Sequence, residues 1–587
     1  MTDDDQTRIL GLHWEKTEFE PWPGAAVGTE WVLLSWGPSR AADALAVVLG
    51  DEGAGVRRAD LATEDVGATV SREGTRGAFV RLPSTEGPRV RQEAGARYVL
   101  FLDETVPMTG SGATNWDWAH AAVRLCQQVA SQPGAKLWIV TRTGLHGPGT
   151  HEVTRPEHDF AWALGRCHAA ESFESWGGLV DLDVDDPATA GRMLADHLLS
   201  DSGEDEVLLR DDGPLVARLR ASTLPPTASG QGLSPERLHV VSGGATGLSF
   251  EVARWLARRG AKRLLILGRS PLDADRERNL RLLESLGCAA KYEVLDVGDP
   301  TAVHALTDRL RGDPLGGVFH LASNWRLDGQ SCVTSLKTAT DEQIEVLLGA
   351  KASGALLLSQ LAEDLGAEAM VLFSSAAATL GSPGQAGYAA ANAVLDGVAR
   401  RLHRGRVRAV SIAWGPIGEV GFGATREGSQ LHDVWERLGL RRLTVDQVLS
   451  TVGMALAQDE PNLTVAAWDE SADLLAGARP VLEALVATEP QGLSLERLGD
   501  QADRVGFIVE VVREHLARML SCAPQEVDPG KALGSLEIDS LIALEMLFVI
   551  EREFAVRLGL DEVLAGMDNT LVAMAELLDQ RIREDGR

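Results

Sequence analysis

The chain has 587 residues, which corresponds to roughly four domain-sized units at about 150 residues each. Its residues are 44% hydrophobic and 24% charged, a composition typical of globular proteins with packed cores. The formal net charge of −29 disfavours a nucleic-acid-binding protein, because such proteins are usually basic.

The N-terminus and the cysteines argue against further classes. The opening sequence MTDDDQTRIL is acidic and lacks the apolar stretch of a signal peptide. No uninterrupted apolar run approaches about 18 residues, the length of a membrane span. The five cysteines form no Cys-x-x-Cys pair and predict neither a disulfide framework nor a metal site. We therefore expect a cytoplasmic protein without a membrane segment.

The first region, residues 1–220, alternates short apolar runs with helix-like stretches, as in a parallel α/β sheet. The pattern predicts strands over 31–35, 98–102, 137–141 and 206–210, and helices over 41–49 and 115–130. A Pro-, Ser- and Gly-rich segment, 221–235, indicates a linker to the next region.

The second region, residues 236–475, has a stronger alternation that is typical of a doubly wound Rossmann fold. Strands are predicted over 238–242, 263–268, 292–295, 316–322, 369–374 and 408–414. A less marked linker, 476–500, leads to a helical third region, 501–583. Its amphipathic helices, predicted over 504–520 and 539–554, indicate a small helical bundle.

A glycine-rich turn, 242–249, follows the first strand of the second region and precedes a helix. In this setting backbone N–H groups and a helix N-terminus face the pyrophosphate of a dinucleotide. The candidate cofactor-binding residues are Gly243, Gly244, Ala245, Thr246, Gly247 and Leu248. The alternative is a tight turn without a ligand.

Two residues near the ends of the next strands are further candidates for cofactor binding. Arg269 is suited to pair with the 2′-phosphate of NADP, unless it is simply a surface arginine. Asp296 is placed to bind the adenine amine or to cap a helix.

Four polar residues form a candidate catalytic group. Ser375 ends a predicted strand, where open α/β sheets place their sites. Tyr388 and Asn392 are four residues apart, so a helix puts them on one face. Lys351 is a rare lysine in an apolar helical stretch. Taken singly, each also has a structural explanation, such as a strand end, a packed ring, a cap or an extended surface lysine.

Taken together, these residues make the second region similar to the ketoreductase domain of modular polyketide synthases, within the short-chain dehydrogenase/reductase superfamily. The spacings between Lys351, Ser375, Tyr388 and Asn392 match that family. The matching segments are SGGATGLS, 242–249; Arg269; HLAS, 320–323; AKASGA, 350–355; LFSS, 372–375; GYAAANAVLD, 387–396; and SIAWGP, 411–416.

The resemblance implies a role for each residue and NADPH as the cofactor. Tyr388 would donate a proton to the substrate carbonyl oxygen, and Lys351 beside it would favour the phenolate. Ser375 would hydrogen-bond the developing alkoxide, and Asn392 would hold the lysine or a water relay. The expected reaction is the reduction of a carrier-bound β-ketoacyl thioester to the β-hydroxyacyl thioester.

The sequence departs from the family pattern in the glycine loop. Thr246 and Ser249 stand where the family has glycine, and Ser249 adds bulk where the helix packs on the strand. The alternative hypothesis is therefore a non-reducing scaffold that only presents a carrier domain. A narrower alternative is α-keto reduction or α-carbon epimerisation at the same site. Leu327-Asp328-Gly329 partly matches a signature of the class that forms 3R alcohols.

The outer regions resemble the usual companions of such a domain. Segments 162–171 and 176–183 resemble the cofactor-free structural subdomain that precedes it, so two Rossmann-like subdomains are expected. The third region resembles a four-helix acyl carrier protein, in which Ser540 of Asp-Ser-Leu would carry 4′-phosphopantetheine. Glu545, Glu551 and Glu553 would face partner enzymes or solvent.

Partner proteins follow from the same resemblance. A phosphopantetheinyl transferase would load Ser540. Neither a ketosynthase cysteine motif nor an acyltransferase Gly-x-Ser-x-Gly motif is found. The chain is therefore expected either to act as a free-standing reductase–carrier protein with separate ketosynthase and acyltransferase proteins, or to be a fragment of a larger chain.

Overall fold

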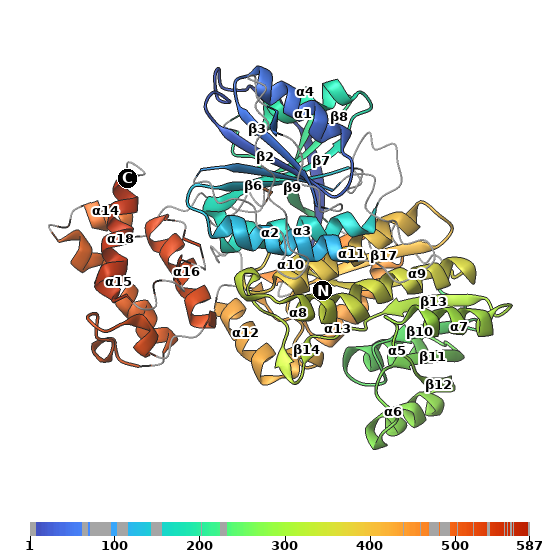
Figure 1. Ribbon diagram of the computed structural model, residues 1–587. Coiled ribbons are helices and arrows are strands. Elements are labelled where there is room, and N and C mark those ends of the chain that lie inside the picture. Colours follow the sequence, from blue (N-terminus) through green and yellow to red (C-terminus); the bar gives the residue numbers. More distant parts are fainter. Residues whose placement is uncertain are drawn as a thin grey trace.

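The computed structural model consists of two α/β halves and a C-terminal helical domain (Figure 1). We call them the N-terminal half (β1–β9), the second half (β10–β19) and the helical domain (α14–α18). The structure describes residues 7–61, 69–70, 95–102, 116–142, 155–200, 202–222, 232–437, 440–457, 460–468, 480–481, 494–499, 501, 503–520, 522–536, 540–556, 558–559, 562–563, 566 and 569–584.

The N-terminal half is built on a mostly parallel sheet. Its strands are β1 (Thr7–Lys16), β2 (Glu30–Ser35), β3 (Gly55–Asp60), β4 (Thr69–Val70), β5 (Arg97–Leu102), β6 (Lys136–Thr141), β7 (Trp176–Asp183), β8 (Glu206–Arg210) and β9 (Gly213–Ser222). Its helices are α1 (Arg40–Asp51), α2 (Asp117–Ala130), α3 (Pro156–Glu171), the short η1 (Phe173–Ser175) and α4 (Pro187–Leu198). The four predicted strands and two predicted helices of this region therefore form.

The second half has the doubly wound alternation. Its main strands are β10 (Leu238–Ser242), β11 (Arg263–Gly268), β12 (Ala289–Val294), β13 (Leu315–His320), β16 (Ala369–Ser375), β17 (Arg408–Trp414) and β19 (Asn462–Trp468). Its helices are α5 (Gly247–Arg258), α6 (Ala274–Ser285), α7 (Pro300–Leu310), α8 (Asp341–Leu347), α9 (Gly354–Asp364), α10 (Ala376–Leu380), α11 (Ala386–His403), α12 (Arg426–Arg437) and α13 (Val445–Ala455). Shorter elements are β14 (Arg326–Leu327), β15 (Gln330–Ser331), η2 (Leu336–Thr338), η3 (Leu348–Ser353), η4 (Gly421–Ala424) and β18 (Leu440–Arg441).

The strand pairings join the two halves. In the second half the order is β12-β11-β10-β13-β16-β17-β19, with every pairing parallel, as in a Rossmann sheet. β1 then pairs antiparallel with β19 on one side and with β9 on the other. From β9 the order continues β8-β7-β6-β5-β2-β3-β4. The first strand of the chain thus bridges two halves that the sequence presents as separate.

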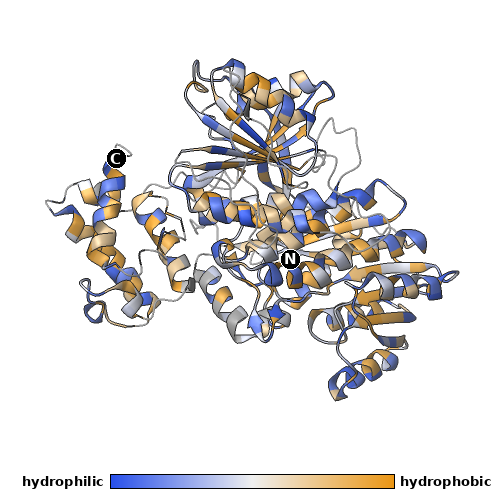
Figure 2. Cartoon of the chain, in the orientation of Figure 1, coloured by the Kyte–Doolittle hydropathy of each residue, from blue (hydrophilic) through white to orange (hydrophobic). Residues whose placement is uncertain are grey.

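The largest core lies between the two sheets. Residues of α2 and α3 from the N-terminal half and of α8, α9 and α11 from the second half share one buried cluster. Separate cores cover the opposite faces, under α1 and α4 and under α5 and α13. The strands that are covered on both faces, such as β5, β10 and β16, are largely buried apolar runs, and many strand segments are orange in Figure 2. The outer strands β3 and β12 carry charged residues instead.

The helical run Asp341–Asp364, which spans α8, η3 and α9, is long and apolar enough to cross a membrane by composition alone. However, 67% of its most apolar window is buried inside the fold. It contributes Ile344, Leu347 and Leu358 to the core between the sheets, and this packing accounts for its apolar character.

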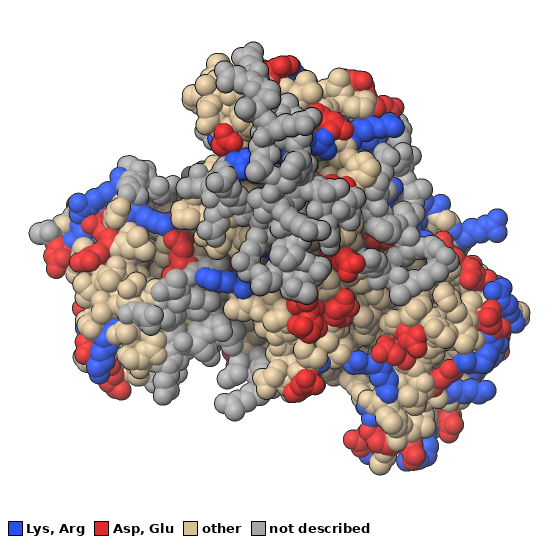
Figure 3. Space-filling model, in the orientation of Figure 1, with Lys and Arg blue, Asp and Glu red and all other residues tan. Residues whose placement is uncertain are grey.

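The helical domain has its own apolar core. Its helices are α14 (Leu495–Gly499), α15 (Arg504–Met519), α16 (Ser540–Phe554) and α18 (Leu571–Glu584), with short turns η7 (Pro524–Glu526) and η8 (Leu533–Leu536). α14 lies inside the segment predicted as a linker, and its Leu498 is buried in this core. On the face shown in Figure 3, acidic and basic side chains are interspersed.

Candidate active site

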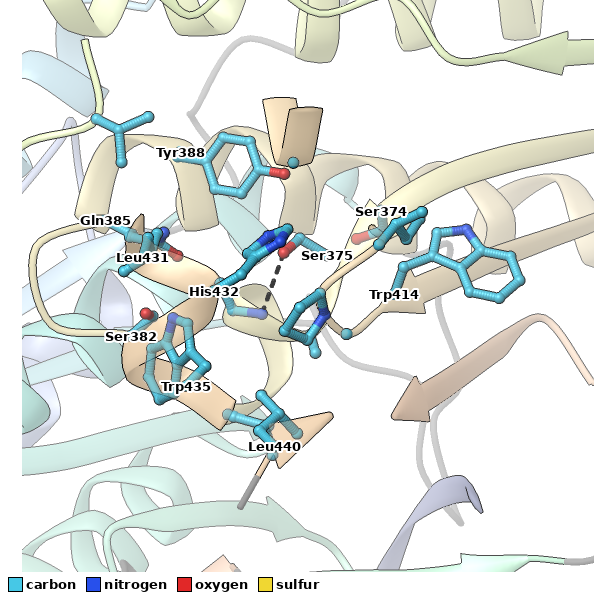
Figure 4. Close-up of a pocket in the computed structure, with 18 of the residues that line it drawn as sticks. Ser374, Ser375, Ser382, Gln385, Tyr388, Trp414, Leu431, His432, Trp435 and Leu440 are labelled. Carbon is cyan, nitrogen blue, oxygen red and sulfur yellow. Dashed lines mark hydrogen bonds between the residues drawn. The ribbon is translucent and has the colours of Figure 1, made fainter. Parts of the chain in front are cut away.

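A cavity of about 600 Å³ opens at the carboxyl ends of β10, β13, β16 and β17. Its wall includes the glycine loop, Lys351, Ser375 and Tyr388. The N-terminal half contributes Phe173, and α12 contributes His432 and Trp435. Figure 4 shows the Tyr388 ring and the Ser375 side chain facing the same space as His432. The structure therefore brings three of the four predicted catalytic side chains to one cavity.

Tyr388 and Asn392 lie one turn apart near the start of α11. Asn392 is buried, and its Nδ2 donates to the backbone carbonyl of Tyr388 at 2.8 Å. Its Oδ1 is a buried acceptor that has no hydrogen-bond partner in the described part of the chain. Burial raises the pKa of Tyr388, while polar interactions with Ser375 and Asn392 lower it. The balance keeps the phenol protonated at neutral pH.

Ser375 is the last residue of β16 and the N-cap of α10. Its Oγ accepts a hydrogen bond from the backbone N–H of Ala377 at 3.3 Å, drawn as a dashed line in Figure 4. That contact uses an oxygen lone pair, so the hydroxyl hydrogen can be donated to Tyr388 or to a ligand between the two side chains. Neighbouring Ser374 donates to the carbonyl of Asn392 at 3.1 Å and ties the strand to α11.

Lys351 lies in η3, a π-helical turn between α8 and α9. Such turns are rare and occur often at functional sites. The side chain is 6% exposed, and its Nζ donates to the carbonyl of Phe373 on β16 at 3.1 Å. Burial lowers the pKa of Lys351 to about 8, so the ammonium is still charged at neutral pH.

His320 links the π turn to the glycine loop, a role that the sequence analysis does not predict. One ring nitrogen, Nδ1, is 2.8 Å from Ser242 Oγ, and the other, Nε2, is 2.9 Å from the carbonyl of Lys351. Burial, followed by the nearby charge of Lys351, lowers the pKa of His320 to about 3. The ring is therefore neutral and joins two parts of the site. The sequence feature that could have predicted this role is the position of a histidine at the end of a predicted strand, now β13.

The glycine loop has the features of a phosphate site. Gly243, Gly244 and Gly247 have positive φ values, which glycine adopts readily. Thr246 is the N-cap of α5, but its side chain makes no cap hydrogen bond. The first N–H groups of α5 are thus not capped by that side chain and are suited to an anion. In the N-terminal half, by contrast, Ser39 caps α1 through the N–H of Ala42 at 3.0 Å.

The substitution at Ser249 is accommodated locally. Its hydroxyl donates to the carbonyl of Thr246 at 2.8 Å, so it turns back into its own helix. A Cβ added to Gly243 would lie 3.2 Å from the Cβ of Ser249, so the serine packs against a position that needs glycine. In the same cavity wall, Trp414 Nε1 and Ser382 Oγ are buried and have no partner among the described residues. These two atoms are closed off from the cavity, so the fit to a dinucleotide rests on the positive φ values of the loop glycines and on the N-terminus of α5.

The predicted cofactor-binding residues divide into two groups. Gly243, Thr246, Gly247 and Leu248 line the cavity, whereas Gly244, Ala245, Arg269 and Asp296 do not. Arg269 is exposed beyond the end of β11. Asp296 accepts from the N–H of Gly298 at 2.9 Å in a local turn, while the N-cap of α7 is Asp299. Asp328 is at the tip of the β14–β15 hairpin and is exposed.

The N-terminal half reaches into the site through Glu171, the last residue of α3. This buried carboxylate accepts from the N–H of Gly384 at 2.9 Å and from the N–H of Leu336 at 2.7 Å. Gly384 lies four residues before Tyr388, so the bond holds the loop that leads into α11. The sequence cannot reveal this contact, because its partners are far apart in the chain.

The helical domain also contributes to the cavity wall, through Leu547, Phe548, Glu551 and Leu558. Ser540 is the first residue of α16, but its side chain and residues 537–539 lie outside the described part of the chain. The expectation that Glu545 and Glu553 face partners or solvent is wrong, since both are buried. Glu553 accepts a hydrogen bond from Ser494 Oγ at 2.8 Å and lies 3.1 Å from His515 Nε2. The hydrogen bond with His515 is the main reason that the pKa of Glu553 is lowered to about 2.

Comparison with known families agrees with this architecture. Residues 238–419 match the KR domain family, and residues 510–578 match the family described as a phosphopantetheine attachment site. The chain carries the ketoreductase and carrier domains of a modular polyketide synthase. Ketoreductase domains bind NADPH, and the attachment site bears 4′-phosphopantetheine. The predicted family and fold class are thus confirmed, and the helical domain is hereafter the carrier domain.

Individual relatives support the same assignment. The chain is 31% identical over 441 residues to the pikromycin polyketide synthase component PikAIII of Streptomyces venezuelae, covering 70% of this chain and 28% of that protein. It is 30% identical over 609 residues to polyketide synthase GfsB of Streptomyces halstedii, covering 96% of this chain and 10% of that protein. The chain therefore spans a minor part of these relatives.

Solved structures show the same fold. An A1-type ketoreductase superposes with a TM-score of 0.65 at 27% identity, over 82% of this chain and 98% of that one. The ketoreductase from the first module of phoslactomycin biosynthesis in Streptomyces sp. HK803 gives a TM-score of 0.62 at 27% identity, over 81% and 98%.

Proposed function

We propose that this chain reduces a β-ketoacyl thioester, tethered to phosphopantetheine on Ser540, to the β-hydroxyacyl thioester with NADPH. One observation carries the proposal. Tyr388, Ser375 and the glycine loop line a single cavity, and the carrier domain of the same chain lines it too. A tethered substrate would therefore meet the reductase at high effective concentration.

In this proposal Tyr388 is the proton donor. When bound, NADPH supplies the hydride to the carbonyl carbon. The raised pKa of Tyr388 favours the protonated phenol, which then gives its proton to the carbonyl oxygen. The Ser375 hydroxyl donates a hydrogen bond to the same oxygen and stabilises the charge that develops there.

Lys351 and Asn392 restore the phenol proton in this scheme. Lys351 is charged at neutral pH. Its Nζ donates to the carbonyl of Phe373, which lies two residues before Ser375 on β16. The unpaired Oδ1 of Asn392 is an acceptor for a water molecule or for the ammonium itself. A water molecule held there would pass a proton from Lys351 to Tyr388, whereas direct acceptance from the ammonium would hold Lys351 in position.

The cofactor would bind along the glycine loop. We assign the pyrophosphate to Gly243, Gly244, Ala245, Thr246, Gly247 and Leu248. The positive φ values of the three glycines and the N-terminus of α5 support this assignment. Arg269 would pair with the 2′-phosphate and Asp296 with the adenine amine, both from the ends of neighbouring strands.

Other proteins complete the reaction sequence in this proposal. A phosphopantetheinyl transferase would load Ser540, and ketosynthase and acyltransferase activities would build the β-ketoacyl chain. The relatives are components of modular polyketide synthases, which supports partners of this kind. We place the reaction in the cytoplasm.

The test is to load the carrier with a short β-ketoacyl group and follow NADPH absorbance. Oxidation that is abolished in Tyr388→Phe is expected, and chiral chromatography of the product then gives its configuration. If the protein neither oxidises NADPH at several chain lengths nor binds it, the non-reducing scaffold is the better account. Release of a reduced α-keto or epimerised product would instead favour the narrower alternative.

A further inference from the structure

The carrier domain touches the second half through an aromatic contact at the cavity mouth. Trp435 of α12 and Phe548 of α16 lie with ring centroids 6.1 Å apart at an interplanar angle of 59°. Both side chains also line the reductase cavity. Figure 1 shows α16 as the carrier helix that faces α12. The carrier thus lies against the entrance rather than apart from it.

A second contact joins the carrier domain to the end of α3 and to η1 in the N-terminal half. Arg581 of α18 pairs with Glu174 of η1 at 2.7 Å. Gly559 approaches the backbone carbonyl of Glu171 so closely that an added Cβ would lie 2.7 Å from the carbonyl oxygen. Of the three atoms nearest to that Cβ, the one that belongs to the carrier is Glu562 Oε2, at an ordinary 3.6 Å. The contact that is too close for a side chain at Gly559 is therefore the one with Glu171, on the reductase side.

We propose that α12 and segment 171–175 together form the docking surface for the carrier domain of this chain. The N-terminal half, whose described part holds no glycine-rich nucleotide loop, then has a task in carrier recognition. The docked carrier closes one wall of the cavity with Leu547, Phe548 and Leu558. The purpose of docking, which is to deliver the acyl group to the reductase cavity, rests on the proposed function. The docking contact itself does not rest on it.

The contacts fit a carrier that must bind and leave. The ion pair between Arg581 and Glu174 is partly exposed, and such pairs contribute little in water. The aromatic pair adds a modest preference for one orientation. A short tether supplies an effective concentration of the order of millimolar, so weak contacts are enough for docking within one chain.

Gly559 provides a variant that acts on the docked state alone. Gly559 accepts from the N–H groups of Glu562 and Val563 and therefore begins a helical turn. Threonine is a good residue at such a position, so Gly559→Thr keeps the carrier turn and adds a side chain against Glu171. Gly566→Thr is the matched control, because an added Cβ at Gly566 meets no described atom within 4 Å.

The experiment is hydrogen exchange of the full-length protein, read by mass spectrometry. We expect Gly559→Thr to raise exchange several-fold in peptides that cover 171–175 and 426–437, with the exchange of α15 unchanged. Gly566→Thr should behave as the wild type. Wild-type exchange in both peptides of the Gly559→Thr protein would overturn the proposal. Loss of wild-type protection on tenfold dilution would also overturn it, since that result assigns the surface to a second copy.

A rate measurement separates docking from catalysis. Glu174→Arg, which does not line the cavity, should slow reduction of the carrier-bound substrate several-fold and leave that of a free short thioester unchanged. The double variant that swaps the two charges, Glu174→Arg with Arg581→Glu, should recover part of the lost rate. Equal slowing of both substrates would overturn the docking role. If neither substrate is reduced by the wild type, the proposed function fails, while the exchange data still decide the docking surface.

Discussion

Lys351→Met should make the protein more stable at neutral pH while it stops turnover. The wild-type ammonium is buried, and its one hydrogen bond to protein that the structure describes is to the carbonyl of Phe373. Burial lowers the pKa of Lys351 from 10.5 to about 8, which means that the folded state opposes the charge. Methionine has a similar shape and no charge, so it removes that opposition.

The magnitude follows from the pKa difference. One pKa unit is 1.36 kcal/mol, so the buried charge costs about 3 kcal/mol at pH 7. The lost hydrogen bond to Phe373 offsets about 1 kcal/mol, leaving the variant about 2 kcal/mol more stable. The folded pKa is depressed, so the unfolded chain binds more protons between pH 8 and pH 10.5, and the wild type gains stability across that window. At pH 10 the two proteins should differ by about 0 kcal/mol.

The assay is urea unfolding followed by tryptophan fluorescence at pH 7 and pH 10, together with NADPH oxidation. Lys337→Met, at an exposed lysine of η2, is the control and should leave the unfolding curve in place. If Lys351→Met is less stable than the wild type by the same amount at both pH values, burial does not oppose the charge, and the reasoning is refuted.

Four further predictions concern the site and its support. Tyr388→Phe keeps the ring but removes the proton donor, so turnover should fall by roughly 10²–10⁴-fold while a fluorescence titration still detects NADPH binding. Between pH 6 and pH 9 the reduction rate should fall as the pH rises through about 8, where Lys351 loses its proton; a flat profile contradicts its role. Glu171→Gln weakens the acceptor that holds Gly384 and Leu336, so steady-state kinetics should show a lower kcat at nearly unchanged KM, and a change in KM alone would oppose this. Glu206→Ala leaves the Arg166 guanidinium buried without the carboxylate that it binds at 2.7 and 2.9 Å, so urea unfolding should show a loss of about 3–5 kcal/mol; an unchanged midpoint contradicts it.

Local sequence patterns were sufficient for most of the fold. Buried parallel strands are continuous apolar runs, so β10 and β17 occur at the predicted residues. Motif spacing was sufficient for the family, because strand ends and helix starts place Ser375 and Tyr388 without knowledge of distant contacts. The strand β1 was missed, since its partners β9 and β19 are distant in the chain and only pairing identifies it.

Motif positions are enough to predict which chemical groups lie at the ends of the strands. The way these groups are held depends on contacts between distant parts of the fold. The π turn at Lys351 and its link through His320 to Ser242 depend on packing between separate elements. Glu171 reaches Gly384 because α3 lies along α11, and Gly559 meets Glu171 because the carrier domain rests on the end of α3. These contacts join residues far apart in the chain, and local patterns carry no information about them.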